Sequence, residues 1–311
     1  MITRENYREY DAVNYSTLSS LSKHPSKVIE ERDWSDGIQS GDVLDILCFD
    51  GEEALFEKYY VSEFSDRDLP SNTVKQIIDE SGDYSDESLL DVAKRINYGQ
   101  SWSEETILRK IFEGGQKYIN LLEESGNRKV IGLDFYTSMF NAADQVKNDP
   151  NTRMFFEGAE FQKPMTTNIK IEDSDVAFKC LCDIYINDRE AVIVGDLKFT
   201  SKPLSSFEYE FMKWRYDIQS SLYSTIPRLI TNKPVEFYNI VYSSTDRAVY
   251  RFKVHQSTIY CGEHGGTING RDYKGWKELT KEYLWHKKHN IWNLPYEFCV
   301  NSELIINPYG S

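Results

Sequence analysis

The stretch VAFKCLCDIYINDREAVIVGDLKFT, residues 176–200, decides the fold of this chain. Two runs rich in apolar and β-branched residues, 176–186 and 191–200, are joined by a short polar connection. Apolar runs of this length on either side of a short polar segment are typical of a β-hairpin. We therefore expect two adjacent strands here, with a sheet built outward from them.

Three polar residues of this hairpin can meet at one edge of the sheet. Asp183 belongs to the first strand, and Asp196 and Lys198 follow near the end of the second. Because successive side chains of a strand point to opposite faces, Asp196 and Lys198 share a face while Leu197 packs behind them. Both acidic residues can therefore converge, with a lysine beside them.

This combination suits the hydrolysis of phosphodiesters. Carboxylate oxygens are hard ligands for Mg²⁺, and a cation such as Lys198 can orient or activate the attacking water and shield the phosphate charge. Two carboxylates at close range repel each other unless a cation neutralises them, so the pair implies a bound metal. Taken alone, the same pattern also fits the polar end of one strand and surface residues of another.

The segment after the hairpin is predicted to form one long helix, from Ser205 to about Ile226. Gln219 and Tyr223 are four residues apart and therefore lie on one helical face. They would present an amide and a phenol beside the strand that carries Asp196. The alternative interpretation is an ordinary amphipathic helix with its apolar side buried.

The rest of the chain supplies helices first and strands later, an order that indicates an α/β or α+β fold. The acidic stretch 62–86, broken by proline and glycine, is predicted as a surface excursion. We expect a single domain over 1–311, mostly helical over 1–150, with the catalytic sheet and its flanking helices over 155–311. Helices are predicted at 16–31 (one or two), 41–60, 87–96, 103–124, 133–147 and 273–288, and strands at 160–171, 235–244 and 248–255.

The formal net charge of −14 opposes a simple charge-driven nucleic-acid binder, which usually shows a basic footprint. An acidic enzyme can still have a basic groove. Local cations therefore matter more than the sum, and four of them lie in or after the hairpin: Lys198, Lys202, Lys213 and Arg215.

The cysteines and the amino-terminal sequence indicate the compartment. The five cysteines are scattered and lack the paired CxxC pattern of a zinc site, so reduced thiols are expected. The first residues have no apolar core of a signal peptide, and no stretch approaches the roughly 20 apolar residues that span a bilayer. We expect a soluble, cytoplasmic protein without a membrane partner.

The order of these motifs resembles the PD-(D/E)XK nucleases, in their RecB-like and RecE-like branch. In that family an aspartate strand precedes a DLK strand, and a helix with a QxxxY motif follows. The corresponding stretches here are CDIYI, GDLKFT and QSSLY. Three upstream stretches are similar to phage and prophage RecE-type exonucleases: YSTLSSLSKHPSKV from residue 15, SGDVLDILCFDGEEALFEKYYV from residue 40 and LDFYTSMFNAADQVKNDP from residue 133.

The resemblance implies a restriction-endonuclease-like core, with a central mixed sheet flanked by helices and a helical amino-terminal elaboration. It also implies a site for Mg²⁺, with Mn²⁺ as a substitute. The expected metal ligands are Asp183, Asp196 and the backbone carbonyl of Leu197. Asp45 would complete the set where the relatives carry a histidine. Aspartate is a harder ligand that suits Mg²⁺ or Mn²⁺, and a solvent-facing helix residue is the alternative for Asp45.

The resemblance further implies roles for residues around the metal. Lys198 would position the attacking water and stabilise the charge that develops on phosphorus, and Gln219 and Tyr223 would orient DNA or brace the lysine. Hydroxyls and cations after the strand could contact phosphate, although solvated loop residues are an equal alternative. The expected DNA-binding residues are Thr200, Ser201, Lys202, Lys213 and Arg215.

The function implied is a Mg²⁺-dependent deoxyribonuclease, more specifically a 5′-to-3′ exonuclease on linear double-stranded DNA in phage recombination or replication. Relatives form rings around DNA, which implies a homo-oligomer. The resemblance also implies a single-strand annealing protein as a further partner. A nuclease for single strands, flaps or internal sites is the first alternative. A non-catalytic DNA-binding recombination protein is the second. An iron–sulfur relative is excluded because Cys261 and Cys299 are too few and too far apart.

Overall fold

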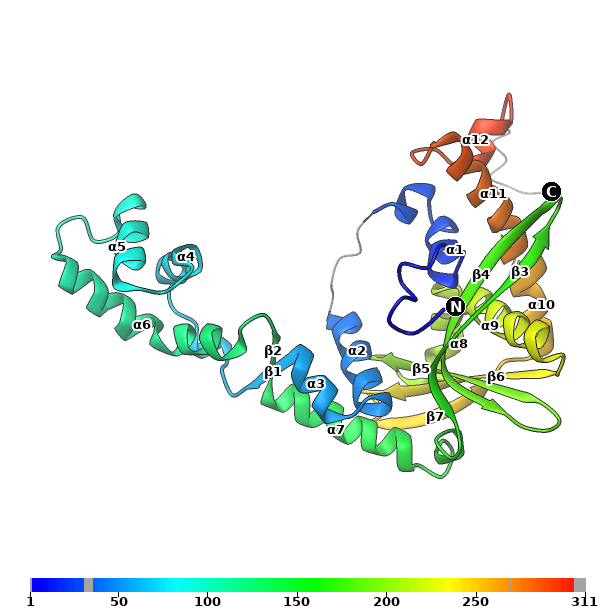
Figure 1. Ribbon diagram of the computed structural model, residues 1–311, viewed down its shortest axis with the longest axis horizontal. Coiled ribbons are helices and arrows are strands. Elements are labelled where there is room, and N and C mark those ends of the chain that lie inside the picture. The colour runs from blue at the N-terminus through cyan, green and yellow to red at the C-terminus, as the bar shows by residue number, and fades with distance from the viewer. Residues whose placement is uncertain (1, 31–35, 269, 305–311) are drawn as a thin grey trace. The chain divides into compact units, whose positions relative to one another are not determined.

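A five-stranded mixed sheet forms the centre of the larger part of the protein, as the computed structural model in Figure 1 shows. Only β5 and β6 run parallel, and every other neighbouring pair is antiparallel. The predicted hairpin of residues 176–200 and the predicted α/β fold with a central mixed sheet flanked by helices are confirmed. The strand order is β3 (Glu160–Ile171), β4 (Ser174–Asn187), β5 (Val192–Thr200), β6 (Val235–Ser243) and β7 (Ala248–Lys253).

The structure describes residues 2–30, 36–268 and 270–304. It divides into two compact units, a larger one of Met1–Phe49 with Ala142–Ser311 and a smaller one of Asp50–Asn141. Residues 1–49 thus belong with the sheet, whereas the sequence grouped them with the helices that follow.

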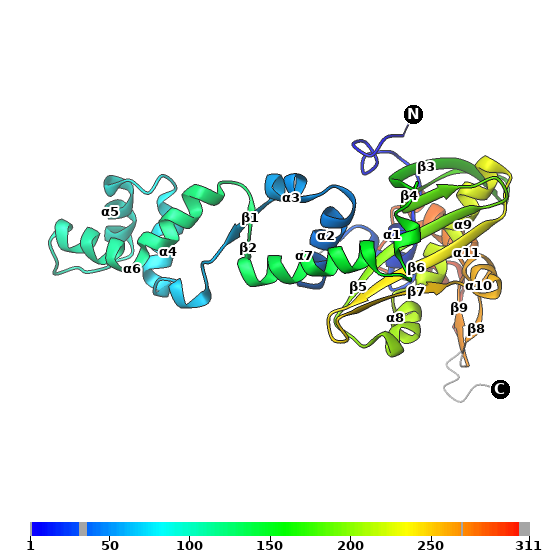
Figure 2. The same cartoon turned by 90° about the horizontal axis from the view of Figure 1, so that it is seen from below.

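One face of the sheet is covered by helix α9 (Tyr216–Thr231), which contacts β3, β4, β5 and β6. Its apolar residues Ile218, Leu222 and Ile226 are fully buried in one cluster with side chains of β4, β5 and β6. Three further helices pack around it, and Figure 2 shows them from below: α1 (Tyr15–Leu21), α10 (Gln256–His264) and α11 (Trp276–His289).

The opposite face is covered by shorter pieces. Helix α2 (Asp36–Phe49) contacts β5, and Phe155 of the 3-10 helix η3 (Arg153–Phe155) packs edge-on against Tyr238 of β6 at a centroid distance of 5.1 Å. Tyr238 points away from the α9 face because it alternates with the core residue Phe237. The sheet is therefore buried on both sides, which suits its apolar strands.

The predicted helix over residues 205–226 is wrong, because the chain breaks in its middle. Helix α8 (Phe207–Lys213) ends before Arg215, whose φ of 60° is left-handed, and α9 begins at Tyr216. Nε of Arg215 donates to Asp217 at 3.0 Å, and Nη2 donates to the Lys274 carbonyl at 2.6 Å. These contacts hold a backbone conformation that side chains other than glycine rarely adopt.

The predicted helix over residues 41–60 is also divided. Helix α2 ends at Phe49, Gly51 has a φ of 88°, and α3 (Glu52–Lys58) leads into strand β1 (Tyr59–Ser62). Only glycine adopts such a φ without steric cost, so Gly51 ends one helix and starts the next.

The smaller unit has its own apolar core between α4 (Asn72–Ser81), α5 (Asp86–Arg95) and α6 (Glu104–Ser125). The predicted surface excursion is therefore wrong, because Val74, Ile77 and Ile78 of α4 are buried. The predicted helices that became α5, α6 and α7 (Leu133–Asn148) are confirmed. Residues 50–141 carry 19 acidic and 10 basic side chains, so this unit holds −9 of the net charge of −14.

The remaining elements complete the chain. The predicted helix over residues 273–288 is confirmed as α11. The first predicted helix became α1 and η1 (Pro25–Val28). Its expected end at Glu31 lies outside the described residues. All five cysteines are free thiols. No helix within the described ranges has the length and apolar character needed to cross a membrane. The sequence missed β2 (Lys129–Gly132), which pairs with β1, as well as η2 (Asp66–Asp68), η4 (Leu204–Ser206), β8 (Gly266–Ile268), β9 (Arg271–Tyr273), α10 and α12 (Tyr296–Val300).

The close packing of α10 on α9 gives the first prediction. A Cβ at Gly262 would lie 2.1 Å from the Asp217 carbonyl oxygen and 2.8 Å from Ser221 Cβ. Gly262→Ala should therefore lower the free energy of unfolding in urea by about 1–3 kcal/mol, as overpacking does. Gly114→Ala on the open side of α6 is the control and should raise it by about 0.5–1 kcal/mol. Equal stability of the Gly262 variant and the parent protein would contradict the close approach.

Candidate active site

Asp183 lies where β4 and β5 stop pairing. The ladder between these strands runs as far as Ile184 opposite Gly195, and beyond it the backbone N–H of Leu197 donates to Asp183 Oδ2 at 2.9 Å. A side-chain carboxylate thus takes the position of a ladder carbonyl. Cys182 and Tyr185 both belong to the core on the α9 face, so side-chain alternation slips by one residue around Asp183.

Asp196 lies on β5 under helix α9 and is 2% exposed. Gln219 Nε2 donates to Asp196 Oδ1 at 2.6 Å, and the ammonium of Lys198 forms an ion pair with Oδ2. Lys198 Nζ also lies 4.6 Å from the ring centroid of Tyr216, at the start of α9. Asp196 is therefore in direct contact with both Lys198 and Gln219.

Asp45 approaches the same cluster from α2. Burial and the charge of Asp183 raise the pKa of Asp45 well above its ordinary value, with a further contribution from Asp196 and opposition from Lys198. Asp45 is half-buried and lies within electrostatic range of both acids and of the lysine.

The electrostatics of the cluster follow from several acids and one cation in a buried place. Burial and the Asp196 charge raise the pKa of Asp183 to about 7, although Lys198 and the Leu197 N–H oppose the rise. Burial also raises the pKa of Asp196. Burial acts to lower the pKa of Lys198, but the charges of Asp196 and Asp183 and the Tyr216 hydroxyl outweigh it, so this pKa is raised. Lys198 alone does not balance the negative charges of Asp45, Asp183 and Asp196, so the pKa values of these acids stay raised.

Gln162 is a site residue that the sequence did not reveal. It lies opposite Asp183 on β3, has a φ of 48°, and its Nε2 donates to Asp183 Oδ1 at 2.9 Å. The left-handed backbone conformation of Gln162 interrupts the regular strand and directs its side-chain amide toward the carboxylate of Asp183. Glu160, the acid at the start of this strand, pairs with Lys163 at the surface.

Tyr223 lies one turn beyond Gln219 and is buried, with its ring 6.5 Å from that of Phe237. Burial and the nearby Tyr7 hydroxyl raise the pKa of Tyr223, and the charge of Asp196 adds to the rise. Tyr223 therefore flanks the acids from inside the core and contacts the amino-terminal segment through Tyr7.

The loop after β5 uses its polar groups internally. Thr200 is buried, and its hydroxyl accepts from the backbone N–H of Lys202 at 3.0 Å. The carbonyls of Ser201 and Lys202 accept from Thr245 and Ser243 at 2.7 Å each. Ser201 and Lys202 are exposed, and the contact of their side chains with phosphate stays a prediction.

The two remaining cations expected to bind DNA differ sharply. Lys213 is exposed, lies 3.8 Å from Glu210 and stacks over Trp214. Arg215 is 7% exposed, and its guanidinium is engaged by Asp217 and the Lys274 carbonyl. Arg215 is thus part of the turn between α8 and α9, and its Nε and Nη2 are not available to phosphate.

Some buried polar atoms at the cluster make no hydrogen bond. Gln219 Oε1 accepts none, and the ion pair with Lys198 is the contact of Asp196 Oδ2. Within the described ranges, no group of three or more histidine, cysteine, aspartate and glutamate side chains could hold a metal ion in this arrangement. The donor set is nevertheless entirely oxygen, as a hard divalent cation prefers, and such a cation would first displace Lys198 from Asp196.

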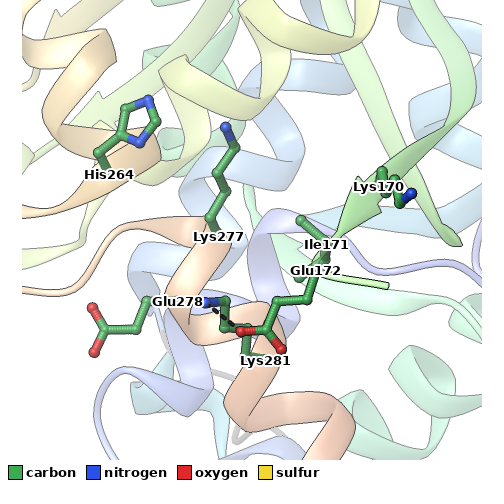
Figure 3. A pocket seen from close by; sticks show the side chains of 7 residues that line it. All are labelled: Lys170, Ile171, Glu172, His264, Lys277, Glu278 and Lys281. Carbon is green, nitrogen blue, oxygen red and sulfur yellow. Dashed lines mark ion pairs between the residues drawn. The ribbon is translucent and has the colours of Figure 1, made fainter. Parts of the chain in front are cut away.

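A separate cleft of about 450 Å³ lies at the end of the β3–β4 hairpin, beside α10 and α11 (Figure 3). Its cations are partly neutralised by neighbouring acids, since Lys281 pairs with Glu172 at 2.7 Å and Lys277 with Glu263 at 2.6 Å. The lining shares no residue with the Asp183–Asp196 cluster and consists of Lys170, Ile171, Glu172, His264, Lys277, Glu278 and Lys281.

The fold is similar to the crystal structure of a "Putative exonuclease" from Eubacterium rectale. The TM-score is 0.53 and the sequence identity 12%, over 100% of this chain and 96% of that one. At this identity the likeness shows the fold alone. A second solved structure, SSO0001, is 12% identical over 74% of this chain and 94% of its own, but its TM-score of 0.28 carries no argument. No protein-family model matches the chain, and no curated protein sequence matches it significantly.

The contrast between Arg215 and Lys213 gives the second prediction. Arg215→Ala leaves Asp217 buried without its ion pair, and should lower the free energy of unfolding by about 3–5 kcal/mol. Lys213→Ala, two residues earlier and exposed, should change it by less than about 0.5 kcal/mol. Urea unfolding followed by circular dichroism measures both. Equal stability of the two variants would contradict a structural role for Arg215.

Proposed function

We propose that this chain is a Mg²⁺-dependent deoxyribonuclease that hydrolyses phosphodiester bonds of DNA. The observation that carries the proposal is the cluster of the buried Asp196 with the half-buried Asp183 and Lys198, joined by Gln219 and approached by Asp45. Acids and a lysine are gathered in one place although burial opposes their charges. A structural role alone would be served better by apolar residues of similar size.

Asp183 and Asp196 would hold the metal, with Asp45 and the Leu197 carbonyl completing its ligands. When bound, Mg²⁺ would polarise the phosphoryl oxygens and lower the pKa of a bound water. Gln162 and Gln219 each fix one carboxylate by donating to its Oδ1. These hydrogen bonds would keep both acids oriented toward the cation.

Lys198 supplies the positive charge that the reaction needs. Its ammonium is held by Asp196 on one side and by the Tyr216 ring on the other. Once the metal has displaced it from Asp196, the ammonium would orient the attacking water and stabilise the negative charge that develops on phosphorus. Tyr223, behind Gln219, would brace the helix that carries the amide.

The more specific proposal is a RecE-type exonuclease that digests linear double-stranded DNA from 5′ to 3′ in phage recombination or replication. The motif order and the fold shared with the Eubacterium rectale protein support it. A homo-oligomeric ring and a single-strand annealing partner belong to the same proposal, as does a cytoplasmic location. Lys202 and Lys213 are exposed cations that could contact the DNA backbone. The acidity is concentrated in residues 50–141, so the net charge is a weaker objection for the larger unit.

The chemistry predicts the effect of two substitutions. Asp196→Asn and Lys198→Ala should each lower Mg²⁺-dependent degradation of linear duplex DNA by at least about 100-fold, since each removes a charge aimed at the reacting groups. Asp188→Asn, in the exposed connection between β4 and β5, is the control and should keep the parent rate. Circular dichroism checks that all three variants are folded. Full activity of either site variant would refute the assignment.

The substrate geometry is tested separately. An exonuclease needs a free end, so linear duplex should be degraded in Mg²⁺ while covalently closed circular duplex stays intact. Linear duplexes labelled on one strand at a time then give the polarity, with Ca²⁺ as the non-supporting control ion. Cleavage of the closed circle at a comparable rate would identify an endonuclease of the same fold.

A further inference from the structure

Asn239 interrupts an apolar row on strand β6. Val235, Phe237 and Val241 lie on the same face of this strand and belong to the core beneath α9. Asn239 occupies the position between Phe237 and Val241 and is fully buried. A side-chain amide thus stands where its neighbours along the row are apolar.

The position of Asn239 in the sheet relates it to the candidate active site. In the parallel ladder between β5 and β6, Asp196 is the register partner of Asn239. Paired residues of neighbouring strands point to the same face. Asn239 therefore points to the face on which Gln219 of α9 donates to Asp196.

Neither polar atom of the Asn239 side chain has a hydrogen-bond partner. Nδ2 and Oδ1 are both buried and unpaired, as is Gln219 Oε1, while Asp196 Oδ2 has its ion pair with Lys198. A buried polar atom without a partner destabilises a fold, whereas an apolar group of the same shape does not. Asn239 Nδ2 is complementary to both neighbouring oxygens, because it is a donor and the oxygens of Asp196 and Gln219 are acceptors.

We propose that Asn239 is a positioning residue of the metal site, whose amide holds the Asp196 carboxylate and the Gln219 amide when a divalent cation displaces Lys198. This role rests on the proposed nuclease function. Its NH₂ group then donates to Gln219 Oε1 and to Asp196 Oδ2, the oxygen from which Lys198 has been displaced. Gln219, held in turn, keeps donating to Asp196 Oδ1.

This role separates metal affinity from stability. Hydrogen bonds that orient a metal ligand typically strengthen binding about 10- to 100-fold. The same amide adds nothing to the stability of the metal-free protein, in which both of its polar atoms are unpaired. A purely structural residue would show the opposite behaviour, with loss of stability and unchanged metal binding.

Asn239→Val and Asn239→Thr form a matched pair, since valine and threonine have nearly the same shape and differ by a hydroxyl. Mn²⁺ binding to each variant and to the parent is measured by titration calorimetry, and the melting temperature is measured without metal. We expect the valine variant to bind Mn²⁺ about 10- to 100-fold more weakly, with an unchanged or raised melting temperature. Threonine, which keeps a donor, should restore most of the affinity.

Each outcome of the experiment decides the proposal. Parent-like Mn²⁺ affinity in the valine variant would overturn it, as would a lowered melting temperature or failure of that variant to fold. Equal weakening by valine and threonine would show that shape, not hydrogen bonding, is responsible. Asp196→Asn identifies the calorimetric signal with this site. A parent protein that binds no Mn²⁺ would instead overturn the proposed metal site and this role with it.

Discussion

The hydrogen bond from the Leu197 N–H to Asp183 Oδ2 is the contact on which the site depends. It spans the place where β4 and β5 stop pairing, and so fixes an acid of one strand beside the acid of the next. The buried carboxylate of Asp196 and the half-buried one of Asp183 would otherwise separate, because desolvation and mutual repulsion both oppose their charges. The ion pair of Asp196 with Lys198 then supplies the positive charge that this arrangement requires.

Helix α9 completes the arrangement, and its direction depends on a feature far from the acids. The left-handed Arg215 ends α8 and starts α9 across the sheet, so that Gln219 reaches Asp196. Close packing at Gly262 keeps the helix in that place. Arg215, which the sequence predicts to bind DNA, is thus buried. It determines where the amide of Gln219 meets the carboxylate of Asp196.

Much of the site could be predicted because several of its residues are related by short spacings in the sequence. Alternation within β5 joins Asp196 to Lys198, and helical spacing joins Gln219 to Tyr223. What the sequence did not reveal is non-local or depends on unusual backbone. Gln162 requires a positive φ, and Asn239 requires a parallel pairing across the α8–α9 crossover. The core of α4 was missed because three apolar residues are buried in a stretch whose composition is acidic and polar.

The smaller unit, residues 50–141, is inserted in the chain between Asp45 and the sheet that carries the other acids. The entropy of closing a flexible segment grows only with the logarithm of its length, so each doubling costs about 0.6 kcal/mol. A unit that folds around its own core shortens the effective segment further. The larger unit can therefore accommodate an insertion of this size with little penalty for bringing Asp45 to the sheet. An insertion at this point can therefore add a further unit to the protein and leave the residues of the candidate active site unchanged.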